Sequence, residues 1–186
     1  MAWTPRPTQL LPVIVCMFAT LARAEGERAF SVGLSWATFS VPGEKEGTME
    51  PTTISPDVGG SLAGIYEHAI GSDFSLRGEA AFGLFSGGQK MDEPAISYAG
   101  LADVGAVFRF DVLKYVPYAF GGVGAVHTWG GPIGDNTTFV LALGGGLDVL
   151  ASREKSWGVE ARLASFGGDV TIFTVGLRAT KRWGYF

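Results

Sequence analysis

The sequence lacks most of the features by which soluble proteins are classified. One of its 186 residues is a cysteine, and only 17% are charged. A single cysteine excludes a disulfide scaffold, which needs paired thiols. With 18 acidic and 14 basic residues, the chain does not carry the basic excess typical of nucleic-acid-binding proteins. No apolar run reaches the ~20 residues of a membrane-spanning helix. Beyond the N-terminal segment, no stretch keeps the 3.6-residue apolar period of a helical fold.

Glycine and apolar side chains are abundant instead. The chain has 28 glycines, roughly twice the average frequency of ~7%, and 47% of its residues are hydrophobic. This much apolar surface excludes a disordered chain. The length suits one folded domain.

The first 24 residues have the composition of a secretory signal peptide. They contain no acidic residue, carry Arg6 near the start, and are apolar from Leu10 to Leu21. They end in the small-x-small sequence 22–24, which is typical of a cleavage site. The apolar run is about 12 residues long, too short to span a bilayer. Cys16 lies within this run and follows Val15, where a lipid-modified cysteine would follow a small residue. We therefore predict a cleaved signal peptide at 1–24 and one domain at 25–186.

The rest of the chain alternates between large apolar and small or charged residues. In 30–38, for example, Phe30, Val32, Leu34 and Trp36 occupy every second position. Because successive side chains of a strand point to opposite faces, each such segment predicts a strand with one apolar face. Six segments alternate clearly, namely 30–38, 74–84, 98–110, 139–149, 157–164 and 173–180. Two alternate less clearly: 60–70, with Leu62, Tyr66 and Ile70 on one face, and 116–128, with Tyr118, Phe120 and Val126 on one face.

The connections predict an up-and-down order of these eight strands. Every second connection is a short polar link, at 71–73, 111–115 and 151–156. The connections between these links are 41–58, 86–97, 130–136 and 167–169, and the first two of them are long. No crossover helix is needed, so a closed antiparallel meander explains the pattern.

The composition of the two faces indicates which one is inside. The interior of an eight-stranded barrel is only just wide enough for side chains, and large apolar residues from every strand would overfill it. We therefore expect glycine, alanine, serine and a few charged residues inside and an apolar band facing lipid, with Trp and Tyr residues near its edges. Opposite charges should pair across adjacent strands, because an unpaired buried charge is costly. The predicted lumen network comprises Arg77, Glu79, Asp103, Arg109, Asp148, Glu160, Arg162 and Arg178.

Several features together resemble the small outer-membrane β-barrel proteins of the OmpA/OmpX type. They are the signal peptide, the eight alternating segments, the segment Tyr118–Gly124 and the terminal Phe186. The resemblance implies an all-β, eight-stranded antiparallel up-and-down transmembrane barrel. It also implies that Tyr185 and Phe186 form a C-terminal signal for the barrel-insertion machinery. Phe186 is out of phase with the alternation of 173–179, so either Tyr185 takes its place or Gly184 marks a bulge.

Catalytic and cofactor sites are weakly supported. Some barrels of this size resemble lipid-modifying enzymes that use a histidine with a serine and an acid. Here only His68 and His127 occur, and neither has that spacing. The glycine-rich stretches 121–124 and 144–146 lack the following helix and lysine of a phosphate loop. The two histidines and the one cysteine, Cys16 of the predicted signal peptide, do not provide the ligands of a zinc site. We predict no enzyme activity, no cofactor and no metal.

The predicted function is that of an integral outer-membrane barrel with a structural or surface-interaction role and a lumen plugged by the charge network. Expected partners are outer-membrane lipid, the insertion machinery and a surface ligand at loops 41–58 and 86–97. We expect a monomer and no nucleic-acid partner. Two alternatives remain: a channel or transporter for small solutes, and a soluble exported barrel that binds an apolar ligand.

Overall fold

The structure, a computed structural model, describes residues 26–44, 51–87, 96–110, 114–131, 135–166 and 170–184. The predicted signal peptide at 1–24 and the predicted insertion signal, Tyr185 and Phe186, lie outside these residues. The central parts of the predicted loops 41–58 and 86–97 also lie outside them.

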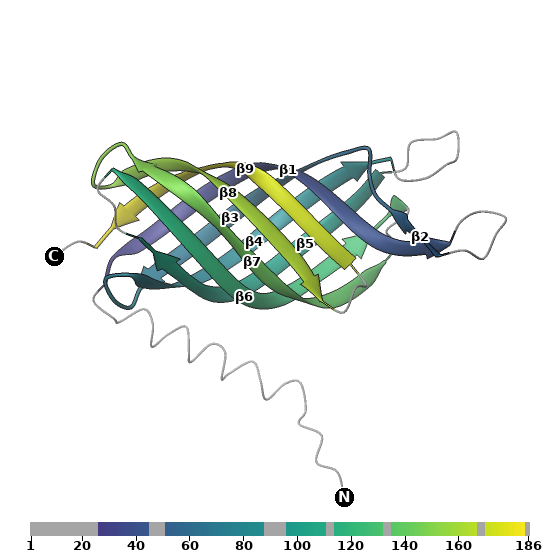
Figure 1. The fold of residues 1–186 in the computed structure, drawn as a ribbon, viewed down its shortest axis with the longest axis horizontal. Coiled ribbons are helices and arrows are strands. Elements are labelled where there is room, and N and C mark those ends of the chain that lie inside the picture. The colour runs from purple at the N-terminus through teal and green to yellow at the C-terminus, as the bar shows by residue number, and fades with distance from the viewer. Residues whose placement is uncertain are drawn as a thin grey trace, which may run out of the picture.

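The described residues form a closed antiparallel β-barrel (Figure 1). Consecutive strands are neighbours in the sheet, and β1 pairs with β9 from Arg28↔Trp183 to Ser40↔Thr171, which closes it. The prediction of an eight-stranded up-and-down barrel is confirmed. Its strands are β1 (Arg28–Glu44), β3 (Val58–Ala69), β4 (Phe74–Ser86), β5 (Ile96–Arg109), β6 (Tyr115–Trp129), β7 (Asn136–Leu150), β8 (Lys155–Phe166) and β9 (Val170–Trp183).

A further short strand, β2 (Pro51–Ile54), lies within the segment predicted as loop 41–58. It pairs with the end of β1, from Val41↔Ile54 to Glu44↔Pro51. The segment predicted as a loop therefore contains a short strand that was not predicted. The β-branched run Thr52, Thr53 and Ile54 favours an extended strand, so the hairpin continues past the barrel wall (right in Figure 1).

The two ends of the barrel differ in their connections. Short turns join β3 to β4, β5 to β6, and β7 to β8 at the end where β9 finishes (left in Figure 1). Backbone hydrogen bonds hold them; Ile70 N–H donates to the Phe74 carbonyl at 3.0 Å, and Ala151 N–H donates to that of Lys155 at 3.0 Å. We call this the short-turn end. The other, which carries the connections after β1, β4, β6 and β8, is the loop end.

The outer surface is an apolar belt. Leu34, Leu143 and Leu177 are 70%, 60% and 63% exposed, and large apolar side chains are exposed on every strand of the barrel. In seven of the eight strands the outward residues are those that the alternation predicts. Soluble monomers rarely expose apolar patches larger than a few hundred Å², whereas a transmembrane barrel requires such a band. Closure also leaves no unpaired sheet edge to face lipid. Among the described residues, no helix is long and apolar enough to cross a membrane.

The face prediction is wrong for β6. Tyr118, Phe120 and Val126, expected on the lipid side, are buried inside the barrel with 4%, 7% and 0% exposure. Small residues such as Ala119 and Ala125 face outward in their place. The two inward aromatic rings lie against arginines of the lumen, which explains their orientation. Tyr118 therefore does not belong to the predicted outer ring of Trp and Tyr residues.

Candidate functional site in the barrel lumen

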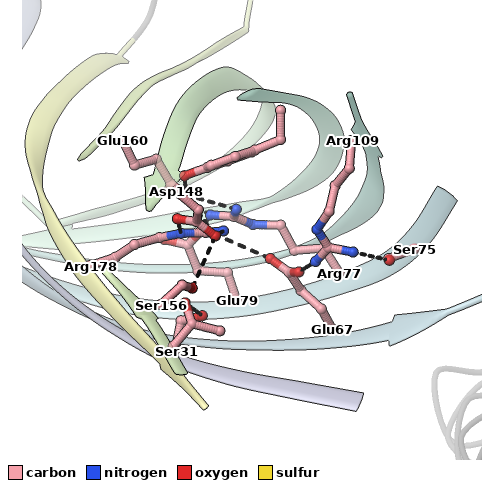
Figure 2. A network of polar contacts seen from close by, with 12 residues as sticks. Ser31, Glu67, Ser75, Arg77, Glu79, Arg109, Asp148, Ser156, Glu160 and Arg178 are labelled. Carbon is pink, nitrogen blue, oxygen red and sulfur yellow. Dashed lines mark hydrogen bonds and ion pairs between the residues drawn. The ribbon is translucent and has the colours of Figure 1, made fainter. Parts of the chain in front are cut away.

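Charged side chains from six strands meet inside the barrel, toward its short-turn end (Figure 2). We call this group the lumen charge network. It consists of Glu67 of β3, Arg77 and Glu79 of β4, Arg109 of β5, Asp148 of β7, Glu160 and Arg162 of β8, and Arg178 and Arg182 of β9.

Arg178 is the most connected member of the network. Its Nε and Nη2 donate to both carboxylate oxygens of Asp148, at 2.9 and 2.7 Å. Its Nη1 donates to Glu160 at 3.2 Å and to Glu67 at 3.3 Å. The guanidinium also lies over the ring of Tyr118, 4.1 Å from its centroid. One arginine thus links three carboxylates from three strands, and bidentate pairing of this kind is among the strongest charge-assisted contacts.

Arg77 is a second residue of the lumen charge network that contacts several partners. Its Nη2 donates to Glu79 at 2.6 Å and to Glu160 at 2.7 Å, and its Nη1 donates to Glu160 at 3.0 Å. Its guanidinium lies 3.9 Å from the ring centroid of Phe120. The Tyr118 hydroxyl donates to Glu160 at 2.9 Å. The inward aromatic residues of β6 therefore supply ring faces for two arginines, an arrangement worth more when the cation is desolvated.

Three further arginines extend the network. Arg109 pairs with Glu67 and donates to the Ser75 hydroxyl at 2.6 Å. Arg162 pairs with Glu79. At the short-turn end, Arg182 donates to Asp148 at 3.1 Å and to the Ser156 hydroxyl at 2.9 Å. Its Nε lies 3.4 Å from Glu27. These contacts leave carboxylates and guanidinium groups paired, as burial demands.

Seven of the eight residues predicted for the network take part in these ion pairs. The eighth, Asp103, is buried, but no ion pair of it occurs among the described residues. Its Oδ2 has no hydrogen-bond partner there. Glu67 and Arg182 also belong to the network. The alternation places Glu67 on the inward face of its strand, but the predicted ion pairs did not include it. Arg182 was not predicted, although it has the inward parity of β9.

The pairing agrees only in part with the prediction of contacts between adjacent strands. Arg178 of β9 does pair with Glu160 of the adjacent β8, but it also reaches Glu67 of β3, past the intervening β1. Arg77 of β4 and Glu160 of β8 reach each other across the lumen. This last pair depends on the diameter of the closed barrel, since the bore is narrow enough for long side chains from opposite walls to meet.

The loop half of the lumen is filled by apolar side chains. Phe39 and Phe85 are each 1% exposed and pack edge to face, with ring centroids 5.1 Å apart. This lumen apolar cluster comprises Ala37, Phe39, Val41, Phe85, Ala99, Leu101, Val126, Val140, Ala164, Val170 and Ile172. The expectation that only glycine, alanine, serine and charged residues line the bore is therefore wrong here. Two buried phenylalanines fit because small residues, alanine among them, surround them.

A small cavity separates the two halves. It is lined by Arg162 and Thr174 on one side and by Phe85, Leu101 and Ile172 on the other, and its volume is about 20 Å³. This is room for about one water molecule. The side chain of Arg162 lines this cavity, and its Nε is buried without a hydrogen-bond partner among the described residues.

The two histidines lie outside this network. His127 is exposed on the outer surface, and its Nδ1 shares a hydrogen bond of 2.9 Å with the Thr137 hydroxyl. His68 is buried, and neither ring nitrogen has a hydrogen-bond partner among the described residues. No group of three or more His, Cys, Asp or Glu side chains in the described part of the chain is arranged to hold a metal ion.

Comparison with known proteins shows a likeness of fold. The chain matches no protein-family model and no curated protein sequence. Among solved structures, Ail, the attachment invasion locus protein of Yersinia pestis in complex with the heparin analogue sucrose octasulfate, is similar with a TM-score of 0.53 and 19% identity, covering 86% of this chain and 100% of Ail. Neisserial surface protein A has a TM-score of 0.59 and 14% identity, covering 84% of this chain and 99% of that one.

A third similar structure is the N-terminal β-barrel domain of Pseudomonas aeruginosa OprF. Its TM-score is 0.54 at 10% identity, and the match covers 86% of this chain and 98% of the domain. The matched structures are covered almost completely, so the whole barrel, rather than a part of it, is shared. The chain has a closed eight-stranded sheet with an apolar outer belt, and its fold is that of the small outer-membrane β-barrels.

Proposed function

We propose that the chain is an integral outer-membrane barrel with a closed lumen and a structural or surface-interaction role. The observation that carries the proposal is the filling of the lumen by side chains in both halves. The lumen charge network occupies the short-turn half, and the lumen apolar cluster occupies the loop half. The cavity lined by Arg162 and Thr174 has a volume of about 20 Å³, which is room for about one water molecule.

The filled lumen argues against both alternatives. A small-solute channel needs a continuous polar path, and the apolar cluster interrupts one. A soluble barrel that binds an apolar ligand needs a wide interior cavity and a polar exterior. The large apolar side chains on the outer surface are instead arranged as a lipid-facing band requires. We propose a non-catalytic role, and the spacing of His68 and His127, which does not match that of a nucleophile with its base, supports it.

Export and insertion are part of the proposed function. The leader at 1–24 would be removed after Ala24, leaving a barrel domain at 25–186, and Tyr185 with Phe186 would be read by the insertion machinery. Fractionation of expressing cells tests the location, and the intact mass of the extracted barrel tests the cleavage. We expect a heat-modifiable band in the outer-membrane fraction and a chain that starts at Glu25. Recovery as a soluble protein without detergent would contradict the proposal.

Surface interaction would take place at the loop end, through 41–58 and 86–97. Ail was solved with a heparin analogue, a polyanion. The two loops of this chain contain more acidic than basic residues. The sequence of 41–58 has one basic residue, Lys45, and four acidic ones, Glu44, Glu46, Glu50 and Asp57. We therefore propose a neutral or basic surface ligand rather than a sulfated polysaccharide.

Planar-bilayer recording tests the closed lumen. We expect the purified barrel to insert without stable single-channel steps, because charged and apolar side chains block the bore. An open porin, reconstituted under the same conditions, controls for insertion. Large, stable single-channel steps from the barrel would overturn the closed-lumen proposal and favour the channel.

A further inference from the structure

Two lysines lie directly opposite each other on the outer surface, at the short-turn end. Lys155 of β8 is the register partner of Lys181 of β9, and both are exposed. Their parity is that of the outward residues Trp157 and Leu177. Side chains in this relation have Cβ atoms about 4.5–5.5 Å apart, and like charges so placed destabilise the sheet.

No ion pair among the described residues includes either lysine. On its other side, Lys181 is the register partner of Phe30, which offers no charge. Two acidic residues lie near this end of the barrel: Glu27, which precedes β1 and lies 3.4 Å from the inward Arg182, and Glu154, in the turn before β8. The Glu154 carbonyl accepts the Arg182 N–H at 2.7 Å, but its carboxylate is in no ion pair with either lysine.

The lysines also lie at a specific depth. Along β9 the apolar belt runs through Phe173, Val175 and Leu177, and Lys181 is the first outward charge after it. Trp157 lies one pair nearer the belt and Trp183 one outward position beyond Lys181, and both are exposed. Tryptophans of this kind mark the boundary between hydrocarbon and headgroups. Two flexible ammonium groups therefore sit at headgroup depth, where lysine side chains extend toward the polar layer.

We propose that Lys155 and Lys181 bind the phosphate of one anionic phospholipid in the leaflet at the short-turn end. A phosphate between the two ammonium groups accepts hydrogen bonds from both and removes their repulsion. A lipid of net negative charge fits better than a zwitterionic one, whose headgroup brings its own cation. Next to the lysines, Ala179 presents only a methyl group between Trp157 and Val32, which leaves space for an acyl chain along the wall. The inference rests on the proposed membrane location of the barrel.

Native mass spectrometry of the detergent-purified barrel, titrated with phosphatidylglycerol or with phosphatidylcholine of the same acyl chains, tests this site. The wild type should bind one phosphatidylglycerol in preference to phosphatidylcholine. The double variant Lys155→Gln/Lys181→Gln should bind phosphatidylglycerol about 30-fold more weakly, because each lysine near an anionic headgroup contributes roughly fivefold. The double variant Lys155→Arg/Lys181→Arg should keep the preference.

A matched variant checks that binding depends on these two lysines rather than on surface charge in general. Lys114→Gln removes an exposed lysine from another short turn and should leave binding unchanged. Heat-modified gel mobility shows whether each variant is folded, and the cell fraction shows whether it is in the outer membrane. Equal binding of both lipids, or unchanged binding of phosphatidylglycerol by the glutamine variant, would overturn the inference. If the barrel is still in the outer membrane, these outcomes leave the proposed function intact.

Discussion

Most of the charged residues inside the barrel pair with opposite charges, and Arg178 and Asp148 each have more than one such partner. The side chains of Arg178 and Asp148 are each 1% exposed, so neither is hydrated by bulk solvent. Moving a charge out of water costs several kcal/mol, and only pairing with good geometry offsets this. Asp148 has two arginine partners and Arg178 has three carboxylate partners, so the loss of one residue leaves several charges short of a partner.

Replacing Arg178 should therefore destabilise the barrel strongly. We expect Arg178→Met to lower the free energy of unfolding by about 3–5 kcal/mol, as is typical when one member of a buried ion pair is removed. Urea unfolding of the barrel in lipid vesicles, followed by tryptophan fluorescence, measures the change. Lys114→Gln, at an exposed turn position, should change the free energy by less than about 0.5 kcal/mol. Equal stability of Arg178→Met and the wild type would show that the network is not structural.

At the residue scale, parity along the strands predicted which charges point inward. Arg77, Arg162 and Arg178 could be assigned because their strands alternate clearly. Their partners could not be assigned, since Arg77 and Glu160 belong to strands on opposite walls. Nothing in the local sequence measures the distance across a barrel.

At the scale of strands, glycine lets the backbones of β5 and β6 approach closely around position 105. Gly105 and Gly122 are register partners. A Cβ atom on Gly105 would lie 2.2 Å from the Gly121 carbonyl oxygen and 2.6 Å from the Gly122 Cα. Both contacts are with backbone, which cannot rotate away, so only glycine permits this spacing.

The substitution Gly105→Ala should therefore disturb the β5–β6 pairing. We expect it to lower the free energy of unfolding by about 1–3 kcal/mol, the usual cost of overpacking. Gly78→Ala is the matched control, because a Cβ there would meet no atom within 4 Å. The same urea titration compares the two variants. If both variants unfolded at the same urea concentration, the close approach of the strands would not constrain position 105.

The strand β6 also shows why alternation can mislead. Its segment contains Gly121, Gly122 and Gly124, so both faces have small residues and size does not distinguish them. Tyr118 and Phe120 point inward because their rings contact the guanidinium groups of two lumen arginines. Those arginines come from β4 and β9, and so the orientation of β6 depends on residues far away in sequence.

At the scale of the whole molecule, the effect of an arginine on the apolar belt depends on whether the belt faces lipid or water. Leu34 is at the middle of the belt, with Leu62 and Leu177 as its register partners on both sides. We expect Leu34→Arg to lower the free energy of unfolding in vesicles by about 2–4 kcal/mol, as an arginine at the bilayer midplane does. Ile96→Arg, at the first residue of β5, should cost only about 0–1 kcal/mol because it is near the interface.

Urea unfolding in vesicles measures the free energy of unfolding of both variants. The comparison tests whether the cost of an arginine depends on its depth in the belt. A barrel with its wall in water would tolerate both arginines alike, because exposed charge would then be solvated at either position. Equal stability of the two variants would therefore contradict a transmembrane belt.

The sequence by itself determined the eight strands, their up-and-down order and the outward face of seven of them. These follow from local rules, since alternation has a fixed period of two and short polar links permit only neighbouring strands to pair. The β1–β9 closure, the contacts across the lumen, the apolar filling of the loop half and the inward turn of β6 were decided only by the tertiary structure. Each of these depends on which residues face one another across a closed bore, a distance that is set by all the strands together.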